Sequence, residues 1–184
     1  MANVLLVISG PSGVGKGTIV RALKERRADV VESISCTTRA PRKGEKDGRE
    51  YFFLSKDEFL RKIEEGGFLE YDAHFENYYG TPKAFVEEQL KTKSVILEID
   101  VKGALKVKKV RPESVLVMIA PPSVDELKAR LVGRNTETEE QIEKRLARLK
   151  YELSKASEYD FVVVNDDLEK AINELEEILD SARA

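Results

Sequence analysis

The chain reads Val4-Leu5-Leu6-Val7-Ile8-Ser9-Gly10-Pro11-Ser12-Gly13-Val14-Gly15-Lys16-Gly17-Thr18 near its start, and this stretch decides the fold. The apolar run predicts a buried strand, and Ile19, Ala22 and Leu23 follow at helical spacing. A glycine-rich turn between strand and helix leaves backbone N–H groups unpaired, and the positive end of the helix dipole adds to them. The turn matches G-x-x-x-x-G-K, in which the lysine reaches the β- and γ-phosphates. The stretch therefore predicts a triphosphate cradle.

One position of the cradle departs from this pattern. The pattern expects Ser or Thr directly after the lysine as a magnesium ligand, whereas Gly17 stands there and Thr18 follows one residue later. One residue turns a helical side chain by about 100°. The sequence therefore supports triphosphate binding more strongly than a direct contact of Thr18 with the metal, and a contact through water is the alternative. The alternative is a glycine-rich turn without a ligand.

Length and composition favour one compact globular unit. The chain has 184 residues, of which 41% are hydrophobic and 35% charged, and it contains no apolar run long enough to cross a bilayer. The N-terminus lacks the basic region of a signal peptide, so we expect a cytoplasmic protein without a membrane partner. The net charge of -3, with signs interspersed, favours no nucleic-acid partner.

The chain contains a single cysteine, Cys36, and a single histidine, His74. One cysteine excludes internal disulfides and cysteine-rich metal sites. A Ser-His or Cys-His nucleophilic system would have to use His74 without the G-x-S-x-G turn that accompanies such sites. We therefore expect no covalent hydrolase chemistry and a structural or solvated His74.

A second apolar run, Val95-Ile96-Leu97-Glu98-Ile99-Asp100, predicts another buried strand that ends in acid. Glu98 and Asp100 have the same parity, which would place both side chains on one face at the carboxyl end of the strand. Ligands of open α/β sheets bind at that edge. A P-loop protein needs an acid there to hold magnesium directly or through water.

The segment between these two strands predicts a small strand-rich insertion. Alternation over 29–38 predicts a strand with Ser33, Ser35 and Thr37 on one face, and a basic loop with Arg39 and Arg42 follows. Further predicted elements are strands at 51–54 and 68–71, a helix opened by a capping box at Ser55, a turn at 77–81, and a helix with Thr81 as N-cap and Pro82 as its first residue. Guanidinium groups suit phosphate oxygens, although solvated surface arginines are the alternative.

The last third of the chain predicts two more core strands with helices between them. The strands are 114–120 and 161–164; the helices begin at capping boxes at Ser123 and Thr138. Arg130 and Arg134 lie one turn apart on the first helix, and Arg145 and Arg148 lie beside the apolar stripe of the second. Arginines converging on one loop indicate a lid over phosphate, although ordinary charged helix faces are the alternative. Asn165, after the last strand, could pair with a base edge, and Asp166 or Asp167 caps the final helix.

Strands that alternate with helices predict an α/β fold: a three-layer P-loop NTPase fold with a parallel core sheet. We assign residues 1–33, 84–122 and 156–184 to the core, 34–83 to the insertion and 123–155 to a helical lid. Two phosphate-bearing substrates would then meet over the cradle. Phosphoryl transfer between them needs alignment, charge neutralisation and exclusion of water, and no covalent nucleophile.

At this point the chain resembles the guanylate kinase family, whose members transfer the γ-phosphate of ATP to GMP. The matching motifs occur in family order over almost the whole chain: 10–16, 35–42, 77–81, 98–100, 120–123, 133–137 and 164–167. Two further positions depart from the family pattern. Glu98 is one methylene longer than the aspartate also found there, and Asn135 stands at a lid position where glycine is expected.

The resemblance implies two nucleotide sites, Mg²⁺ bound with ATP, and specific residue roles. ATP would lie on Gly10, Pro11, Ser12, Gly13, Val14, Gly15, Lys16, Gly17 and Thr18, with Arg130 and Asn165. Arg39, Arg42, Tyr51 and Tyr79 would hold the GMP phosphate, and Ser35, Glu70, Gly80, Thr81 and Glu98 would complete the GMP site around the guanine. The catalytic set would be Lys16, Arg39, Arg42, Arg134 and Arg145, and Asp100 would position magnesium.

Elementary chemistry supports one of these roles independently. A carboxylate such as Glu70 can accept hydrogen bonds from both N1–H and N2–H₂ of guanine, which adenine cannot offer. Glu70 with Ser35 thus disfavours a kinase for another monophosphate. The rival class is a non-catalytic guanylate-kinase-like module that binds phosphopeptides, against which the intact Lys16 and lid arginines argue. We expect a monomer or a small homo-oligomer.

Overall fold

The computed structural model describes all residues except 1, 75 and 124–138. Five parallel strands form a core sheet in the order β2-β7-β1-β8-β9. These strands are β1 (Leu5–Ser9), β2 (Val30–Glu32), β7 (Ser94–Glu98), β8 (Val115–Ala120) and β9 (Phe161–Val164). β1 lies at the centre, so the glycine-rich turn leaves the sheet at its middle, with β7 and β8 on either side.

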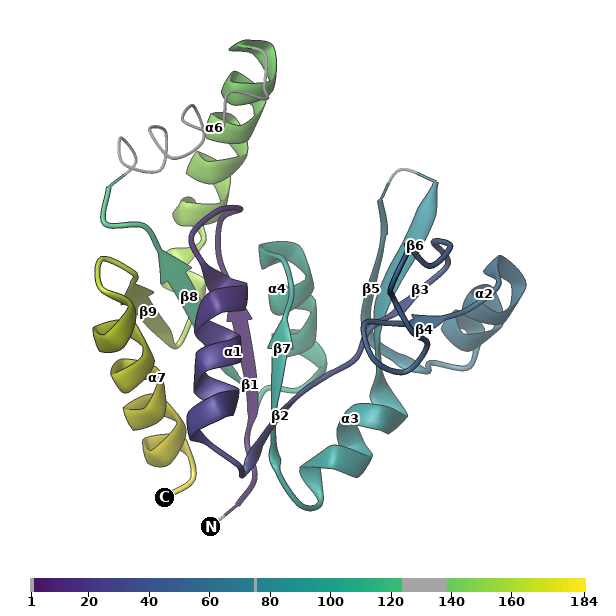
Figure 1. The fold of residues 1–184 in the computed structure, drawn as a ribbon, viewed down its shortest axis with the longest axis horizontal. Helices are drawn as coiled ribbons and strands as arrows, with labels where there is room; N and C mark the ends of the chain where they lie inside the picture. Colours follow the sequence, from purple (N-terminus) through teal and green to yellow (C-terminus); the bar gives the residue numbers. More distant parts are fainter. Residues whose placement is uncertain (1, 75, 124–138) are drawn as a thin grey trace.

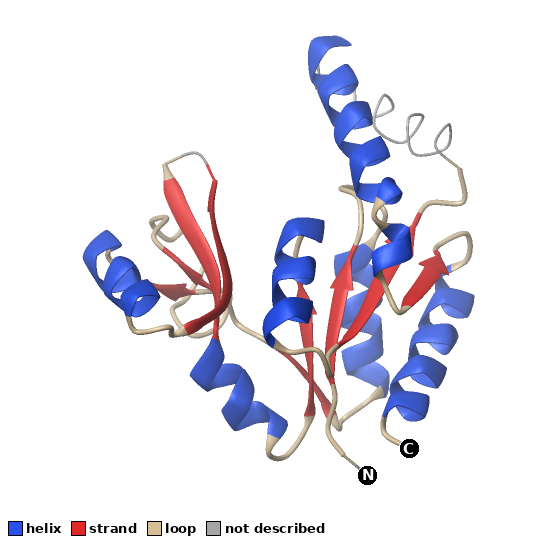
Figure 2. Ribbon diagram, turned by 180° about the vertical axis from the view of Figure 1, so that it is seen from behind, coloured by secondary structure: helices blue, strands red, loops and turns tan. Residues whose placement is uncertain are grey.

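Helices cover both faces of the core sheet, because side chains of β1 alternate between two hydrophobic clusters. Leu6 and Ile8 pack with α1 (Lys16–Arg26) and α7 (Leu168–Ala182). Leu5 and Val7 pack on the other face with α3 (Lys83–Leu90) and α4 (Val101–Val110). Figure 2 shows α4 in front of the core strands. The predicted three-layer α/β fold is confirmed.

The insertion forms a second sheet beside the core (Figure 1). Its order is β4-β3-β6-β5, made of β3 (Cys36–Thr37), β4 (Phe52–Phe53), β5 (Phe68–His74) and β6 (Asn77–Pro82). The helix α2 (Lys56–Glu64) covers it through Phe59, which is fully buried and stacks on Phe68 with ring centroids 4.4 Å apart. The predicted capping box at Ser55 is confirmed: its hydroxyl accepts from the Glu58 amide, and the Glu58 carboxylate accepts in return.

Two predictions about the insertion are wrong. The strand expected over 29–38 is broken, because the chain leaves the core sheet after β2 and joins the second sheet at β3. The turn expected over 77–81 is strand β6, which pairs antiparallel with both β3 and β5. Consequently Thr81 lies in a strand instead of capping a helix, and Pro82 takes the N-cap position of α3.

The polar end of β7 also differs from the prediction. Only Glu98 belongs to the strand; Asp100 lies beyond it and caps α4, because its carboxylate accepts from the Gly103 amide at 2.8 Å. The two side chains therefore do not share a strand face. The sequence analysis assigned no element to 101–110, although Val101, Ala104 and Val107 recur at helical spacing and are buried.

The C-terminal part contains α6 (Glu139–Ser154), a short 3₁₀ turn η1 (Ala156–Glu158), β9 and α7. Asp167 is the cap of α7, since its carboxylate accepts from the Lys170 amide at 2.9 Å. The capping boxes predicted at Ser123 and Thr138 involve residues outside the described part of the chain. None of the helices among the described residues combines the length and apolar character needed to cross a membrane.

Candidate active site

The glycine-rich turn between β1 and α1 has the backbone geometry of an anion cradle. Gly10, Gly13 and Gly15 have φ of 140°, 87° and 93°, a region that L side chains rarely adopt. Gly10 also touches the neighbouring strand: a Cβ there would lie 2.2 Å from the carbonyl oxygen of Ile119. Gly15 is the N-cap of α1, so the positive end of the helix points at the turn.

Lys16 and Asn165 hold this turn from its two sides. The Lys16 ammonium donates to the carbonyls of Gly10 at 2.7 Å and Pro11 at 3.0 Å. The Asn165 amide donates to the carbonyl of Val14 at 2.7 Å, so this side chain braces the cradle and its base contact stays a prediction. Burial lowers the pKa of Lys16, and the carboxylate of Glu98 opposes that shift.

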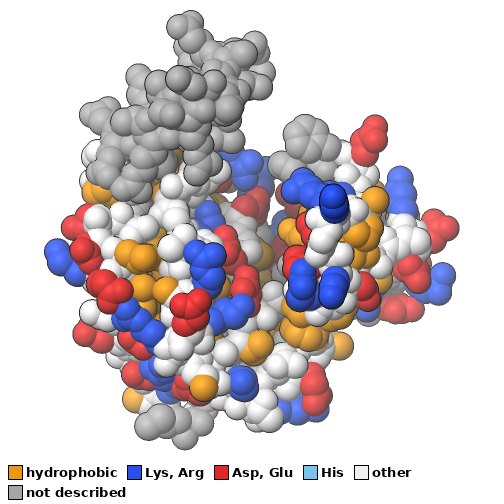
Figure 3. All heavy atoms as spheres, viewed as in Figure 1, with side chains coloured by type: hydrophobic (Ala, Val, Ile, Leu, Met, Phe, Trp, Pro, Cys, Tyr) orange, Lys and Arg blue, Asp and Glu red, His pale blue; other side chains and the backbone are white. Residues whose placement is uncertain are grey.

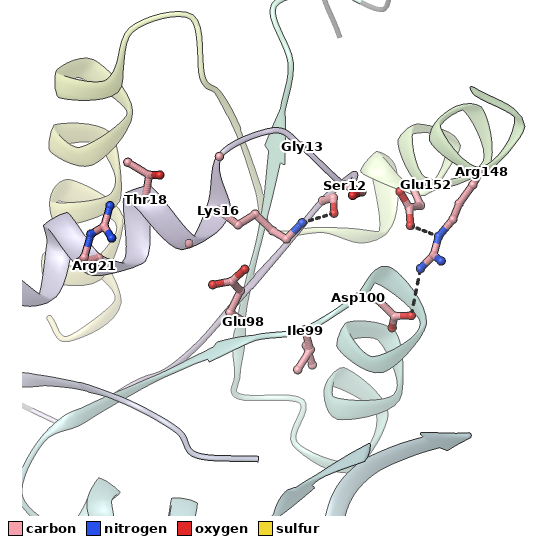
Figure 4. A pocket seen from close by; sticks show the side chains of 13 residues that line it. Ser12, Gly13, Lys16, Thr18, Arg21, Glu98, Ile99, Asp100, Arg148 and Glu152 are labelled. Atoms are coloured by element: carbon pink, nitrogen blue, oxygen red, sulfur yellow. Dashed lines mark hydrogen bonds and ion pairs between the residues drawn. The ribbon is translucent and has the colours of Figure 1, made fainter. Parts of the chain in front are cut away.

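A cavity of about 780 Å³ opens over the cradle (Figure 4). It is lined by the cradle residues Gly10, Ser12, Gly13, Gly15, Lys16, Gly17 and Thr18, and by Arg21, Glu98, Ile99, Asp100, Arg148 and Glu152. Figure 3 shows a hollow between the core and the insertion, with acidic and basic side chains on its walls. The cavity is mostly polar in its lining residues, as a site for a charged ligand requires.

Gly17 faces the carboxylate of Glu98. A Cβ at Gly17 would lie 3.5 Å from Glu98 Oε2, so an oxygen-bearing group already occupies the side of α1 on which the pattern expects a hydroxyl. Thr18 projects from another side of α1 than Gly17, although it still lines the cradle cavity (Figure 4). Glu98 is exposed as a residue, but partial loss of water around its carboxyl raises its pKa, against the attraction of Lys16. A direct contact of Thr18 with a metal thus stays a prediction.

A second cavity, of about 330 Å³, adjoins the first on the side of the insertion. Its lining comprises Ser35, Tyr51, Glu70, Asp72, Tyr79, Gly80, Glu98, Ile99, Asp100 and Arg148. Six residues predicted for the acceptor site, Ser35, Tyr51, Glu70, Tyr79, Gly80 and Glu98, therefore lie together around one cavity. Asp72 was not predicted; it lies two residues beyond Glu70 on β5, and that spacing places both side chains on one face.

Glu70 is a nearly buried carboxylate, 9% exposed. The hydroxyl of Thr81, on the neighbouring strand β6, donates to its Oε1 at 2.7 Å. Burial raises the pKa of Glu70, and the negative charge of Asp100 adds to the rise, whereas the Thr81 hydrogen bond and Lys106 lower it. A buried acceptor held by one neighbour is suited to read the N–H groups of a ligand.

The two arginines of the basic loop have different surroundings. Nη2 of Arg39 donates to both carboxylate oxygens of Glu45, at 2.9 Å and 3.0 Å, and the guanidinium lies over the ring of Tyr51, 5.4 Å from its centroid. Its pKa is raised by the hydrogen bonds to Glu45. The side chain of Arg42 is exposed, and its backbone amide donates to the same carboxylate at 2.7 Å. Glu45 thus organises the loop, a role without any signal in the sequence pattern.

Arg148, on α6, lines both cavities, and Figure 4 shows its side chain between Glu152 and Asp100. Its Nε donates to Glu152 at 2.9 Å, and its Nη2 lies 3.5 Å from Asp100 Oδ2. Arg148 was among the arginines of the predicted phosphate lid, although it received no specific site role, and Glu152 was not predicted. Their spacing of four on a helix is a signal for an ion pair. Arg130 and Arg134 lie outside the described part of the chain, and so does the side chain of Arg145.

Cys36 lacks the properties of a reactive thiol. Cys36 is 2% exposed, and burial raises the pKa of its thiol to about 11, whereas a nucleophilic cysteine needs a lowered pKa. His74 ends β5. The burial of Cys36 thus argues against a covalent nucleophile at this thiol.

Magnesium would find oxygen donors at this site. Among the described residues no group of three or more His, Cys, Asp and Glu side chains could hold a metal by itself. Mg²⁺ usually takes one or two carboxylates and completes its shell with phosphate and water. Asp100 lines the cradle cavity, and its Oδ2 lies 3.5 Å from Arg148 Nη2, the one ion pair of Asp100 among the described residues, so the donors present fit such an ion.

Comparison with known proteins gives consistent results. A sequence model described as guanylate kinase matches residues 2–182. The chain is 51% identical to a guanylate kinase of Caldanaerobacter subterraneus, covering 96% of this chain and 86% of the relative, and 48% identical to one of Clostridioides difficile, covering 98% and 89%. The crystal structure of guanylate kinase from Anaplasma phagocytophilum superimposes with a TM-score of 0.75 at 37% identity, covering 98% of this chain and 86% of that one.

Proposed function

Because the chain belongs to the guanylate kinase family, we propose that its two adjoining cavities bind ATP and GMP for phosphoryl transfer. The chain is an ATP:GMP phosphotransferase that forms ADP and GDP. In this assignment the cradle cavity receives ATP and the smaller cavity beside the insertion receives GMP. One observation carries the assignment: Glu98, Ile99, Asp100 and Arg148 line both cavities, so ligands in the two cavities would meet without leaving the protein.

The reaction then needs little covalent chemistry from the protein. A phosphate oxygen of GMP attacks the γ-phosphorus of ATP, a P–O bond forms to GMP, and the P–O bond to the β-phosphate breaks, with ADP leaving. The cradle amides and Lys16 stabilise the charge on the donor phosphates. Exclusion of water keeps the phosphoryl group from hydrolysis. We assign the same supporting role to Arg134 and Arg145, as predictions from the family resemblance.

The acceptor phosphate is assigned to the basic loop and its aromatic neighbours. Arg39 lies against Tyr51, and the rings of Tyr51 and Tyr79 lie edge to face, 6.0 Å between centroids. Arg39 pairs with Glu45 through Nη2 alone, so phosphate binding would replace this pair with a forked one that uses two nitrogens. Arg42 is exposed beside it and free to join the phosphate.

The guanine is assigned to the buried end of the acceptor cavity. Glu70 would accept from N1–H and N2–H₂, and Ser35 and Thr81 lie around the same region. Thr81 already donates to Glu70 Oε1, which leaves Oε2 and the remaining lone pairs for the base. Adenine presents an acceptor at N1 instead of a donor, so the same carboxylate would reject AMP.

Magnesium is assigned to Asp100, with Glu98 and Thr18 as further oxygen donors near the cradle. When bound, Mg²⁺ neutralises charge on the β- and γ-phosphates. Asp100 is positioned for this by its place at the N-terminus of α4, where the Gly103 amide fixes Oδ1 at 2.8 Å. The lid role of 123–155 and the adenine contact of Asn165 stay predictions.

The non-catalytic phosphopeptide module is the weaker alternative, because such a module needs neither an intact cradle nor Lys16. One coupled assay separates the two. We would offer ATP with GMP, AMP, UMP or CMP and follow ADP formation. Phosphorylation of GMP well above the other monophosphates supports the proposal. Absence of turnover with every monophosphate, together with binding of a phosphoserine peptide by calorimetry, would contradict it.

A further inference from the structure

Arg148 is the one basic side chain, within the part of the chain that the structure describes, that lines both nucleotide cavities. Lys16 and Arg21 border only the cradle cavity of these two. The Arg148 side chain is half exposed, at 52%, so its guanidinium is accessible from the cavities. Its position on α6 brings a charge from the C-terminal third of the chain to the border where donor and acceptor phosphates would meet.

Two carboxylates interact with this guanidinium. Glu152, 5% exposed and one helical turn further along α6, accepts from Nε at 2.9 Å. Asp100 Oδ2 lies 3.5 Å from Nη2, an ion pair longer than a hydrogen bond. The bond at Nε fixes the stem of the side chain, and the N–H groups on the two terminal nitrogens make no hydrogen bond within the described residues.

The lining of the cradle cavity carries three basic side chains, Lys16, Arg21 and Arg148, and three acidic ones, Glu98, Asp100 and Glu152. Arg148 and Lys16 face one cavity, and the charge of Arg148 lowers the pKa of Lys16. Two cations that repel each other across a cavity are stabilised together when an anion enters between them. Phosphates of two nucleotides supply such an anion at the border where Arg148 lies.

We infer that Arg148 is a further catalytic residue, which contacts the phosphates of both nucleotides where they meet, and that Glu152 is its positioning residue. The inference rests on the proposed function and adds a group to it. On nucleotide binding, Arg148 would exchange its ion pair with Asp100 for contacts with the phosphates, whereas its Nε would stay hydrogen-bonded to Glu152. A guanidinium offers forked donors to two phosphate oxygens at once, whereas the point charge of a lysine does not.

The test compares Arg148→Ala and Arg148→Lys with Lys150→Ala. Lys150 is exposed on the same helix and borders neither cavity, which makes it a control for loss of a positive charge from α6. We would measure kcat and KM for both substrates, and the Kd values of ATP, of GMP and of a bisubstrate probe in which five phosphates join adenosine to guanosine.

We expect Arg148→Ala to lower kcat about 100-fold and to weaken the bisubstrate probe by a larger factor than either nucleotide alone. Arg148→Lys should recover only part of the loss. Guanidinium chloride at millimolar concentration should restore part of the Arg148→Ala activity, and potassium chloride at equal ionic strength should not. A purely structural role of Arg148 would not produce this rescue.

Glu152→Gln is expected to lower kcat less than Arg148→Ala does, because it loosens the guanidinium without removing it. If circular dichroism shows that Arg148→Ala has lost helix content, the same measurements are made on Arg148→Met, which keeps the packing of the aliphatic stem. If the unmodified protein phosphorylates GMP normally and the Arg148 variants have kcat values within about twofold of that of Lys150→Ala, the inference is overturned and the proposed function stays intact. Failure of the unmodified protein to phosphorylate GMP would instead overturn the proposed function.

Discussion

Replacing Glu70 with glutamine tests the reading of guanine most directly. The Thr81 hydroxyl donates to Oε1; as long as it keeps donating to the oxygen at that position, the glutamine NH₂ group takes the place of Oε2. Guanine N1–H and N2–H₂ then meet a donor. Each hydrogen bond to a charged acceptor contributes about 1.5–3 kcal/mol.

The loss of these contacts should cost about 3 kcal/mol in binding of the GMP transition state, since at least one charged acceptor is replaced by an opposed donor. At 1.4 kcal/mol per tenfold, this corresponds to about 150-fold. Adenine, whose N1 is an acceptor, does not meet the same opposition. We therefore expect the ratio of kcat/KM for GMP to kcat/KM for AMP to fall by about two orders of magnitude.

The assay is steady-state ADP formation with each monophosphate, and the control is Glu174→Gln, which removes the same charge from the exposed face of α7. A second background sharpens the test. In Thr81→Val the amide can turn over, because the hydroxyl that fixes it is gone, so Glu70→Gln should cost less there. An unchanged GMP-to-AMP ratio in Glu70→Gln, with folding intact, would refute the assignment of Glu70 to the base.

Three further predictions concern the cradle and the acceptor site. Gly10→Ala should lower the free energy of unfolding by at least about 3 kcal/mol in urea titrations, because its Cβ would press on the carbonyl of Ile119. Gly44 also has a positive φ, 93° against 140° at Gly10, but faces open space, so Gly44→Ala should cost about 1 kcal/mol; equal losses would contradict the geometry. Burial raises the pKa of Glu70, and GMP binding needs its charged form. The GMP affinity measured by calorimetry should therefore fall on acidification, beginning at a pH above the ordinary pKa of glutamate, whereas the contribution of this carboxyl to folding stability should rise as the pH falls. A GMP affinity that does not change over that pH range argues against a carboxylate contact. Lys16→Ala should lower kcat about 100-fold or more while calorimetry shows nearly unchanged GMP binding, and near-normal turnover would remove Lys16 from its role.

The cradle and the core sheet can be predicted from the sequence because their signals are local. The run Val4–Ile8 is apolar on both faces, and the structure buries all of it between two helical layers. The glycines stand where positive φ is required. A strand followed by such a turn is compatible with few folds. Further apolar runs in the sequence then predict the neighbouring strands.

The insertion was harder to predict because its pairings join distant residues. The segment 77–81 carries turn residues, yet β3 and β5 on either side make it a central strand. Thr81 resembles an N-cap in the sequence, but its hydroxyl binds Glu70, eleven residues earlier and on another strand. Local patterns do not contain such cross-strand partners.

The same reason explains Arg148 and Asp100. Their ion pair joins α6 to the start of α4, and nothing in either segment indicates the other. The sequence does indicate an amphipathic α6 with arginines beside its stripe. Which arginine reaches the cavity depends on how α6 packs through Leu149 on the core, and this packing is a property of the folded chain.

The burial of Cys36 makes the unmodified sequence a suitable background for fluorescence labelling. Its thiol is enclosed and remains protonated at the pH at which maleimides react. Cysteines introduced at exposed positions, such as Glu64 on α2 and Glu174 on α7, would therefore accept a donor and an acceptor dye without prior removal of a native thiol. Energy transfer between the two dyes would then follow the separation of insertion and core as each nucleotide is added.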